Sequence, residues 1–381
     1  MAFSNCSAVK EINLNNKITS IGAYAFQNVS IPNTVVVYDS TTYIGCGAFQ
    51  GCTNIQEITL PFTGRSADAS AYEAVFGFVF GYTTKSSSAS GTSRNTNFIN
   101  AQYGTVDGAI WQYSCKYASN GDNLSYFYYI PSSIRKVTIT NQGSVQTAAF
   151  NGCNNIKNVT YTQTISSLNV AAFQNCTSLR TFNSTTEGTI DLNGTIKELG
   201  GYAFKNCSYI NNIQMVEGLL TINEYAFENL SVRSVVVPTS VQTIQIGAFH
   251  KCNSIESITL PFVGKSADAS AYEAVFGYIF GYTTKTSSAS GTSRNTTFIN
   301  TKYGNVDGAT WQYSCKYASN GDNQSYFYYI PSTLRTVTIT AQRNVPTAAF
   351  NGCTMLTRIT YTQGVGSRGS YAFQNCNATV N

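Results

Sequence analysis

The chain has 381 residues and a net charge of +5, and only 11% of its residues are charged. Nucleic-acid-binding proteins cluster Lys and Arg to neutralise phosphates, so we expect no nucleic acid among its partners. No apolar stretch is long enough to cross a membrane, which predicts no membrane insertion. The first residues already lie inside a repeat and carry no export signal, so we expect a fragment of a longer secreted protein or one whose signal was removed.

One short phrase, Ala-Phe-x-x-Cys, recurs along the chain. The complete copies end at Cys6, Cys52, Cys153, Cys176, Cys207, Cys252, Cys353 and Cys376. Two more copies, at Phe26 and Phe227, lack only the cysteine. Most consecutive phenylalanines of the phrase are 22 or 23 residues apart, with one step of 31 and two of 101. A fixed period in the twenties indicates a solenoid of stacked turns.

A second phrase, Leu/Ile/Val-x-x-Ile/Val-x-Leu/Ile/Val, follows the first, as in Ile55 to Leu60. Its alternation and β-branched residues are typical of a strand lying on a core. Together the phrases give the leucine-rich-repeat formula in a 23-residue form, and the chain resembles the BspA-like leucine-rich repeat family outside two long insertions. The resemblance implies a β-rich, single right-handed solenoid of about eleven turns with a parallel sheet along one side.

Taken in order, residues 1–61 hold ordinary repeats and residues 62–133 an expanded one. In the expansion, Ser70 to Glu73 has the pattern of a capping box at the start of a short apolar helix, which Gly81 ends. We expect this helix to replace the missing Ala-Phe element. A Ser/Thr-rich loop near residues 85–95 and an aromatic β-hairpin with an Asn-Gly turn follow it.

The expansion occurs twice. Residues 134–261 return to ordinary repeats, one of them lengthened by about eight residues in a loop around residues 187–194. Residues 262–333 then repeat the first expansion almost letter for letter, 200 residues later, and residues 334–381 complete the repeats. Recent duplication and selection on a repeated binding unit both explain this likeness.

The cysteine of the phrase occupies the same place in successive turns. Equivalent side chains in neighbouring turns run parallel and pair poorly as disulfides, so we expect a ladder of buried, reduced thiols. The sequence contains no Cys-x-x-Cys pair, and we predict no metal site and no cofactor.

Candidate catalytic residues are few. The single histidine, His250, takes the place of Gln50 in the other copy and is predicted to face solvent. The only repeated close pair of acids is Asp68 and Glu73, and it supports the alternative hypothesis of a carbohydrate-active enzyme. Glu73 is better explained by the capping box, so we predict a protein that is not an enzyme.

Two surfaces are candidates for binding. The first is the pair of aromatic hairpins, because large aromatic side chains most often carry binding energy. Its residues are Trp111, Tyr113, Tyr117, Tyr126, Tyr128, Trp311, Tyr313, Tyr317, Tyr326 and Tyr328. Some of these rings must instead pack on the solenoid, since an alternating strand has an inner face. The alternative surface is the outer, concave face of the sheet, where one position is Thr59, Thr138, Thr160, Thr259, Thr338 and Thr360.

The resemblance implies a non-enzymatic binding or adhesion module of a secreted or cell-surface protein, in contact with host, matrix or glycan ligands. We expect its partner to be an extracellular protein or glycan. Two weak hairpin sites on one chain would favour a repetitive ligand through avidity. A purely structural spacer is the remaining alternative.

Overall fold

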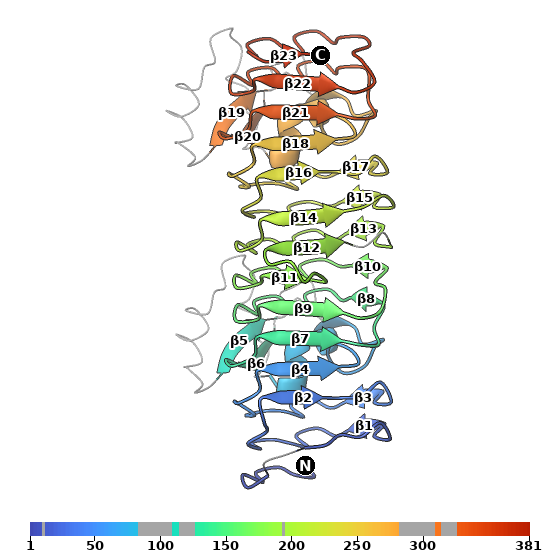
Figure 1. Ribbon diagram of the computed structural model, residues 1–381, viewed down its shortest axis with the longest axis vertical. Helices are drawn as coiled ribbons and strands as arrows, with labels where there is room; N and C mark the ends of the chain where they lie inside the picture. The colour runs from blue at the N-terminus through green and yellow to red at the C-terminus, as the bar shows by residue number, and fades with distance from the viewer. Residues whose placement is uncertain (10–11, 83–108, 114–125, 193–194, 282–308, 314–325) are drawn as a thin grey trace. The chain divides into compact units, whose positions relative to one another are not determined.

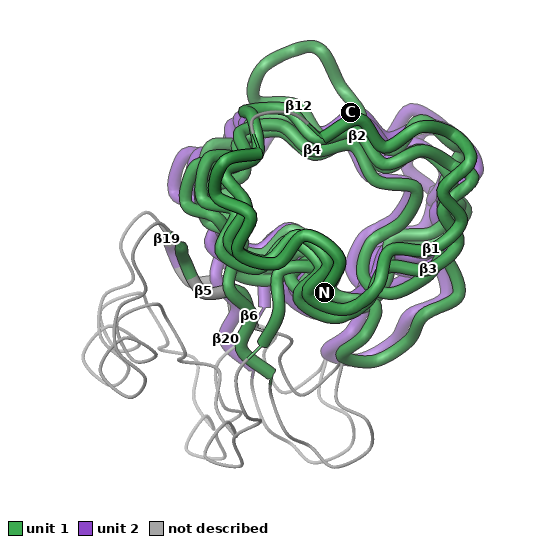
Figure 2. The backbone as a smooth tube through the Cα atoms, turned by 90° about the horizontal axis from the view of Figure 1, so that it is seen from below, with its two compact units in different colours: residues 1–190, 202–209 green, residues 191–201, 210–381 purple. Residues whose placement is uncertain are grey.

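The computed structural model describes residues 1–9, 12–82, 109–113, 126–192, 195–281, 309–313 and 326–381, with the backbone alone at Trp111, Tyr113, Ala309, Trp311 and Tyr313. In this part of the chain the fold is a β-rich solenoid of about twelve turns with little helix, which confirms the predicted leucine-rich-repeat solenoid. The chain divides into two compact units, residues 1–190 with 202–209 and residues 191–201 with 210–381 (Figure 2).

The first unit stacks one main strand from each turn into a parallel sheet (Figure 1). These strands are β2 (Thr34–Val36), β4 (Glu57–Leu60), β7 (Lys136–Ile139), β9 (Asn158–Tyr161), β11 (Thr181–Phe182) and β12 (Thr189–Leu192). Equivalent positions pair along the stack, so that Val35, Ile58, Val137 and Val159 form one buried row. The opposite limb carries β1 (Ser20–Ile21) paired with β3 (Tyr43–Ile44), and β8 (Ser144–Val145) paired with β10 (Ser167–Leu168).

The second unit is built in the same way. Its main strands are β14 (Asn212–Met215), β16 (Ser234–Val236), β18 (Ser257–Leu260), β21 (Thr336–Ile339), β22 (Arg358–Tyr361) and β23 (Thr379–Val380). Its short strands are β13 (Glu198–Leu199), β15 (Thr221–Ile222) and β17 (Thr243–Ile244). Val235, Ile258, Val337 and Ile359 form its buried row.

One predicted loop is partly strand. The extra residues around 187–194 were expected to lengthen a loop, but β12 begins at Thr189 and pairs with β11, Thr181 opposite Thr189 and Phe182 opposite Ile190. The insertion therefore adds a strand to the sheet, because Ile190 supplies another buried side chain at the core position.

Phenylalanines of the repeated phrase stack along the interior of each unit. In the first unit, the rings of Phe3, Phe26 and Phe49 are nearly parallel, with neighbouring centroids 5.5 Å apart. Further stacked pairs are Phe150 with Phe173, Phe173 with Phe204, Phe227 with Phe249, and Phe350 with Phe373. The repeated phrase thus supplies stacked aromatic rings to the interior of each unit.

The cysteines of the phrase bond to the backbone. The Sγ–H group of Cys52 donates to the carbonyl of Phe26 at 3.0 Å, and Cys176 donates to the carbonyl of Phe150 at the same distance. The nine cysteines in the described part of the chain are all free, and the six between Cys52 and Cys353 that belong to the phrase are buried. Cys207 and Cys252 make the same kind of bond, so these four thiols contact a carbonyl of the preceding turn instead of pairing with a neighbouring cysteine.

In each expansion, short 3₁₀ helices take the place of an Ala-Phe element, as predicted. They are η1 (Ala71–Ala74) and η2 (Phe76–Phe80) in the first copy, and η5 (Ala271–Ala274) and η6 (Phe276–Phe280) in the second. The N–H of Phe49 donates to the Val79 carbonyl at 2.9 Å, and the N–H of Phe76 donates to the Ala149 carbonyl at 2.8 Å. The rings of Phe80 and Phe76 likewise connect Phe49 to Phe150.

The predicted capping box is wrong. Ser70 makes no side-chain cap, and Val75 is extended between η1 and η2, so no single helix forms. Ala71 has a left-handed φ of 50°, which is incompatible with the first turn of an α-helix. Glu73 instead pairs with Arg65, whose Nη1 lies 2.8 Å from its carboxylate.

Each expansion also contains the predicted antiparallel hairpin, which lies outside the coil of turns in Figure 2. Its strands are β5 (Ala109–Tyr113) with β6 (Phe127–Pro131), and β19 (Ala309–Tyr313) with β20 (Phe327–Pro331). Buried Gln112 fixes the first hairpin, since its Oε1 accepts from the N–H of Gly77 at 2.6 Å and its Nε2 donates to the Ala149 carbonyl at 2.9 Å. Gln312 makes the same two bonds at the same distances in the second copy.

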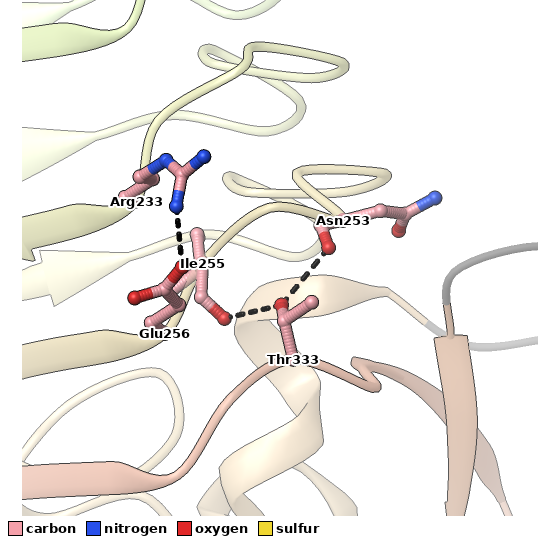
Figure 3. Close-up of polar contacts among 5 residues, drawn as sticks. All are labelled: Arg233, Asn253, Ile255, Glu256 and Thr333. Carbon is pink, nitrogen blue, oxygen red and sulfur yellow. Dashed lines mark hydrogen bonds and ion pairs between the residues drawn. The ribbon is translucent and has the colours of Figure 1, made fainter.

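A hydroxyl group fixes the chain where it leaves the second expansion (Figure 3). The Oγ1 of Thr333 donates to the carbonyls of Asn253 and Ile255 at 2.9 and 2.7 Å. Beside them, Nη1 of Arg233 lies 2.8 Å from Oε1 of Glu256. Strand β21 follows Thr333, so these bonds hold β21 against β18. The paired residues Ser257 and Thr336 are 79 positions apart in sequence.

Candidate binding surfaces

The six predicted threonines form two rows on the outer face of the main strands. In the first unit, Val36, Thr59, Thr138 and Thr160 pair in that order. In the second, Val236, Thr259, Thr338 and Thr360 do the same. We call each row a threonine ladder. The side chains are partly exposed because they alternate with buried core residues.

The hydroxyl groups of the ladders are open to a ligand. In the described part of the chain, none of the six threonine hydroxyls makes a hydrogen bond. The row beside the first ladder holds the exposed ion pair between Lys136 and Glu57, with Nζ 3.2 Å from Oε2. Each ladder therefore presents evenly spaced hydroxyl and methyl groups beside few charges, a surface suited to hydrogen bonding along an extended partner.

Four of the ten hairpin candidates face the core. Tyr126 and Tyr128 are 6% and 0% exposed, and Tyr326 and Tyr328 are 4% and 0% exposed. The Tyr128 hydroxyl donates to the Tyr72 carbonyl at 2.6 Å. The burial of these four rings corrects their assignment as contact residues. They belong to segments that lie on the solenoid, since β6 packs against η2 and β20 against η6.

The other six candidates remain predictions. Trp111 and Tyr113 lie in β5, and Trp311 and Tyr313 lie in β19, where only the backbone is described. Tyr117 and Tyr317 lie outside the described residues.

A cluster of tyrosines joins the first hairpin to the 3₁₀ helices. The rings of Tyr72 and Tyr126 stack with centroids 4.2 Å apart, and Tyr82 meets Tyr126 edge-on at 5.3 Å. Burial raises the pKa of Tyr82 to about 12 and that of the neighbouring Cys46 thiol to about 11. These groups are therefore neutral near pH 7, which suits packing better than acid–base chemistry.

The acids of the expansions are held by partners. Glu73 pairs with Arg65, and Glu273 pairs with Lys265 at 2.9 Å. A hydrogen bond from the Ser66 hydroxyl lowers the pKa of Asp68. The general acid of a glycosidase has a raised pKa, whereas the pKa of Asp68 is lowered. Asp68 is therefore a poor candidate for a general acid.

His250 does not face solvent freely, contrary to the prediction. It is half-buried, and its Nδ1 lies 2.7 Å from the carbonyl of Phe280. Its ring meets those of Tyr225 and Tyr329 edge-on. Within the described ranges, no group of three or more His, Cys, Asp or Glu side chains is arranged to hold a metal ion, and no helix is long and apolar enough to span a membrane.

The sequence prediction missed one surface feature. A depression of about 270 Å³ lies next to the first threonine ladder. It is lined by Asn16, Val36, Val37, Tyr38, Asp39, Ser40, Thr59 and Thr140. A signal existed in the sequence, since Tyr38 and Asp39 depart from Pro238 and Thr239 in the otherwise similar later segment.

The chain is similar to one family model and to solved structures of repeat proteins. A family model described as BspA type leucine rich repeat region matches six copies over residues 1–77, 123–190, 180–277 and 323–380. Two similar solved structures are a leucine-rich repeat protein from Bacteroides ovatus and a leucine rich cell surface protein from Faecalibacterium prausnitzii. The first is 16% identical with a TM-score of 0.44, covering 99% of this chain and 67% of that one. The second is 16% identical with a TM-score of 0.34, covering 97% and 68%. No curated protein matches the chain.

Proposed function

The chain belongs to the BspA-type leucine-rich repeat family, and from that premise we propose that it is a non-enzymatic binding module of a secreted or cell-surface protein. Its partner is an extracellular protein or glycan. The observation that carries the proposal is the pair of threonine ladders, whose free hydroxyls lie in register on a partly exposed face of the sheet with few charges. A repeated row of this kind matches a ligand that is itself extended.

The described chemistry supports binding over catalysis. Glu73 and Glu273 are ion-paired, and the pKa of Asp68 is lowered. Six cysteines of the phrase are buried rather than exposed as nucleophiles, and four of them donate to backbone carbonyls. A regular hydroxyl surface instead offers many weak contacts, whose sum is large only when the partner repeats as well.

An array of immobilised extracellular-matrix proteins and glycans tests this function with the whole chain. We expect binding to at least one component, and a loss of about tenfold in affinity for Thr138→Lys, which places a bulky charge in the middle of the first ladder. The matched control is Thr164→Lys, an exposed threonine in the first unit away from the ladder. Absence of binding to every component, or equal losses in both variants, would contradict the proposal.

A further inference from the structure

The depression beside the first ladder is formed by a loop with a fixed conformation. After β2, the N–H of Thr41 donates to the Tyr38 carbonyl at 2.9 Å, which closes the loop. The hydroxyls of Ser40 and Thr41 both donate to the carbonyl of Ile18, at 3.0 and 2.8 Å, which ties the loop to the preceding turn. The side chain of Tyr38 is therefore presented from a backbone held on two sides.

The carboxylate of Asp39 is also positioned. Its Oδ1 accepts a hydrogen bond from the hydroxyl of Thr140, which lies 101 residues away in sequence. Thr140 is fixed in turn, since its N–H donates to the Leu60 carbonyl at 2.9 Å. One carboxylate oxygen is thus used to orient the group, and the other is left for a ligand.

Three polar groups around the depression are unused. Within the described part of the chain, Oδ2 of Asp39, the hydroxyl of Tyr38 and the amide of Asn16 have no hydrogen-bond partner. The Tyr38 side chain is also an exposed aromatic, at 42% of its surface. An aromatic ring beside a carboxylate and an amide can contact the C–H face of a sugar ring while the polar groups bond to its hydroxyls.

We propose that this depression is a saccharide subsite that binds one sugar residue of a neutral glycan. The inference rests on the proposed binding function and specifies one ligand class and one place for it. The volume of about 270 Å³ suits a single small ring rather than a folded partner. A single carboxylate provides too few oxygens to hold a hard cation without further protein ligands.

The second unit contains an internal comparison. Ser240 donates to the Leu219 carbonyl at 2.8 Å, as Ser40 does to Ile18, so the two loops are equivalent. By this equivalence Pro238 and Thr239 take the places of Tyr38 and Asp39, and Glu217 takes the place of Asn16. The later loop therefore lacks the aromatic ring.

The polar groups of the later loop also satisfy one another. Oε1 of Glu217 accepts from the N–H and the hydroxyl of Thr239, both at 2.9 Å, and Oε2 accepts from the N–H of Ser240 at 2.8 Å. These bonds lower the pKa of Glu217 and keep its carboxylate occupied. We therefore expect the first unit to bind sugar at this position and the second unit not to bind it.

Saturation-transfer difference NMR on the whole chain tests the inference. The probes are the methyl glycosides of glucose, galactose, mannose and N-acetylglucosamine, followed by titration of the strongest binder. We expect at least one probe to bind, and Tyr38→Ala and Asp39→Asn each to raise Kd at least about tenfold. The control Tyr43→Ala removes an equally exposed ring outside the depression and should leave Kd unchanged. Thermal unfolding of each variant checks that it is folded.

Three results would overturn the saccharide subsite. They are the failure of all four probes to bind, unchanged Kd in both Tyr38→Ala and Asp39→Asn, and an equal loss in Tyr43→Ala. Asp39-dependent binding of a lysine-rich peptide with no glycoside bound would also overturn it, in favour of a cationic ligand. If the glycosides fail while the matrix array still shows binding that depends on Thr138, the subsite is wrong and the proposed function stands. If no component of the matrix and glycan array binds the chain, the proposed binding function is wrong as well.

Discussion

Gln112 accepts a 2.6 Å hydrogen bond from the backbone N–H of Gly77, and this contact joins the hairpin to the 3₁₀ helix that completes the solenoid. The same side chain donates to the Ala149 carbonyl, so one buried amide satisfies two backbone groups from separate elements. The hairpin is thus an integral part of the core rather than an appended arm.

Replacing Gln112 with alanine should destabilise the chain by about 3 kcal/mol, because the substitution leaves the buried N–H of Gly77 without a partner and opens a cavity. The Ala149 carbonyl loses one of its two bonds and keeps the one from the N–H of Phe76. Urea denaturation followed by circular dichroism measures the change. The control is Gln56→Ala, whose side chain is exposed. Equal stability of Gln112→Ala and the parent chain would show that water replaces the amide at no cost.

Gly77 is needed for close approach. A Cβ at this position would lie 2.3 Å from Cβ of Tyr128 and 2.8 Å from Oε1 of Gln112. We expect Gly77→Ala to cost about 2 kcal/mol through overpacking. Gly143→Ala is the matched control, because its Cβ would meet no atom closer than 3.7 Å. Comparable unfolding midpoints for the two variants would mean that the hairpin shifts to accept the methyl group.

Much of the fold could be predicted because the same residue pattern recurs in many turns. The 23-residue period predicted the stacked turns and the ladder of buried cysteines, and the alternation around Ile58 and Val137 predicted the inward row of the sheet. The same repeat showed where an Ala-Phe element is missing, so a helix in its place was expected, and η2 lies between Phe49 and Phe150.

Features that occur once per expansion could not be predicted in this way. Gln112 lies between aromatic residues in an alternating strand, and nothing local distinguishes a buried amide from an exposed one. Ser70 and Glu73 have capping-box spacing, but Arg65 competes for the carboxylate and Ala71 has a left-handed φ. The site at Tyr38 and Asp39 depends on Thr140, which is 101 residues from Asp39 in sequence. The two residues are adjacent in the fold because the first expansion lies between the strands that carry the repeat.

Alkaline pH should weaken the folded state through the cysteine ladder. Burial raises the pKa of Cys52 to about 11 and of Cys252 to about 12, against 9.0 for an unperturbed thiol. Folding therefore disfavours the thiolate, and as the pH rises the unfolded chain loses these protons first. The free energy of unfolding should fall from about pH 9 until the pH exceeds the pKa values of the folded state. Chemical denaturation at pH 8, 9, 10 and 11 measures this, and Cys52→Ala with Cys252→Ala should reduce the slope. A slope unchanged by both substitutions would assign the loss to other groups.

Removing the acids of the expansions should have little effect. Glu73 and Glu273 form partly exposed ion pairs, which typically contribute less than about 1 kcal/mol. We expect the double variant Glu73→Gln with Glu273→Gln to fold, to unfold near the parent midpoint and to keep its binding to the array. Assays of glycoside hydrolysis on both proteins provide the counter-test, and an activity present in the parent and absent in the variant would revive the enzyme hypothesis.

Four of the ten hairpin candidates are buried, so the hairpin hypothesis rests on the other six. They are Trp111, Tyr113, Tyr117, Trp311, Tyr313 and Tyr317. Deleting a hairpin is not a clean test of this hypothesis, because Gln112 and Gln312 bond to the core. Substitution of Trp111 and Trp311 by alanine, with Tyr43→Ala as the control for an exposed ring, is the better design. If the hairpins carry contacts, two sites on one chain act together, and the double variant should lose far more binding to an immobilised polymer than to a monovalent fragment. Full retention of polymer binding, alongside loss in Thr138→Lys, would leave the threonine ladder as the contact surface.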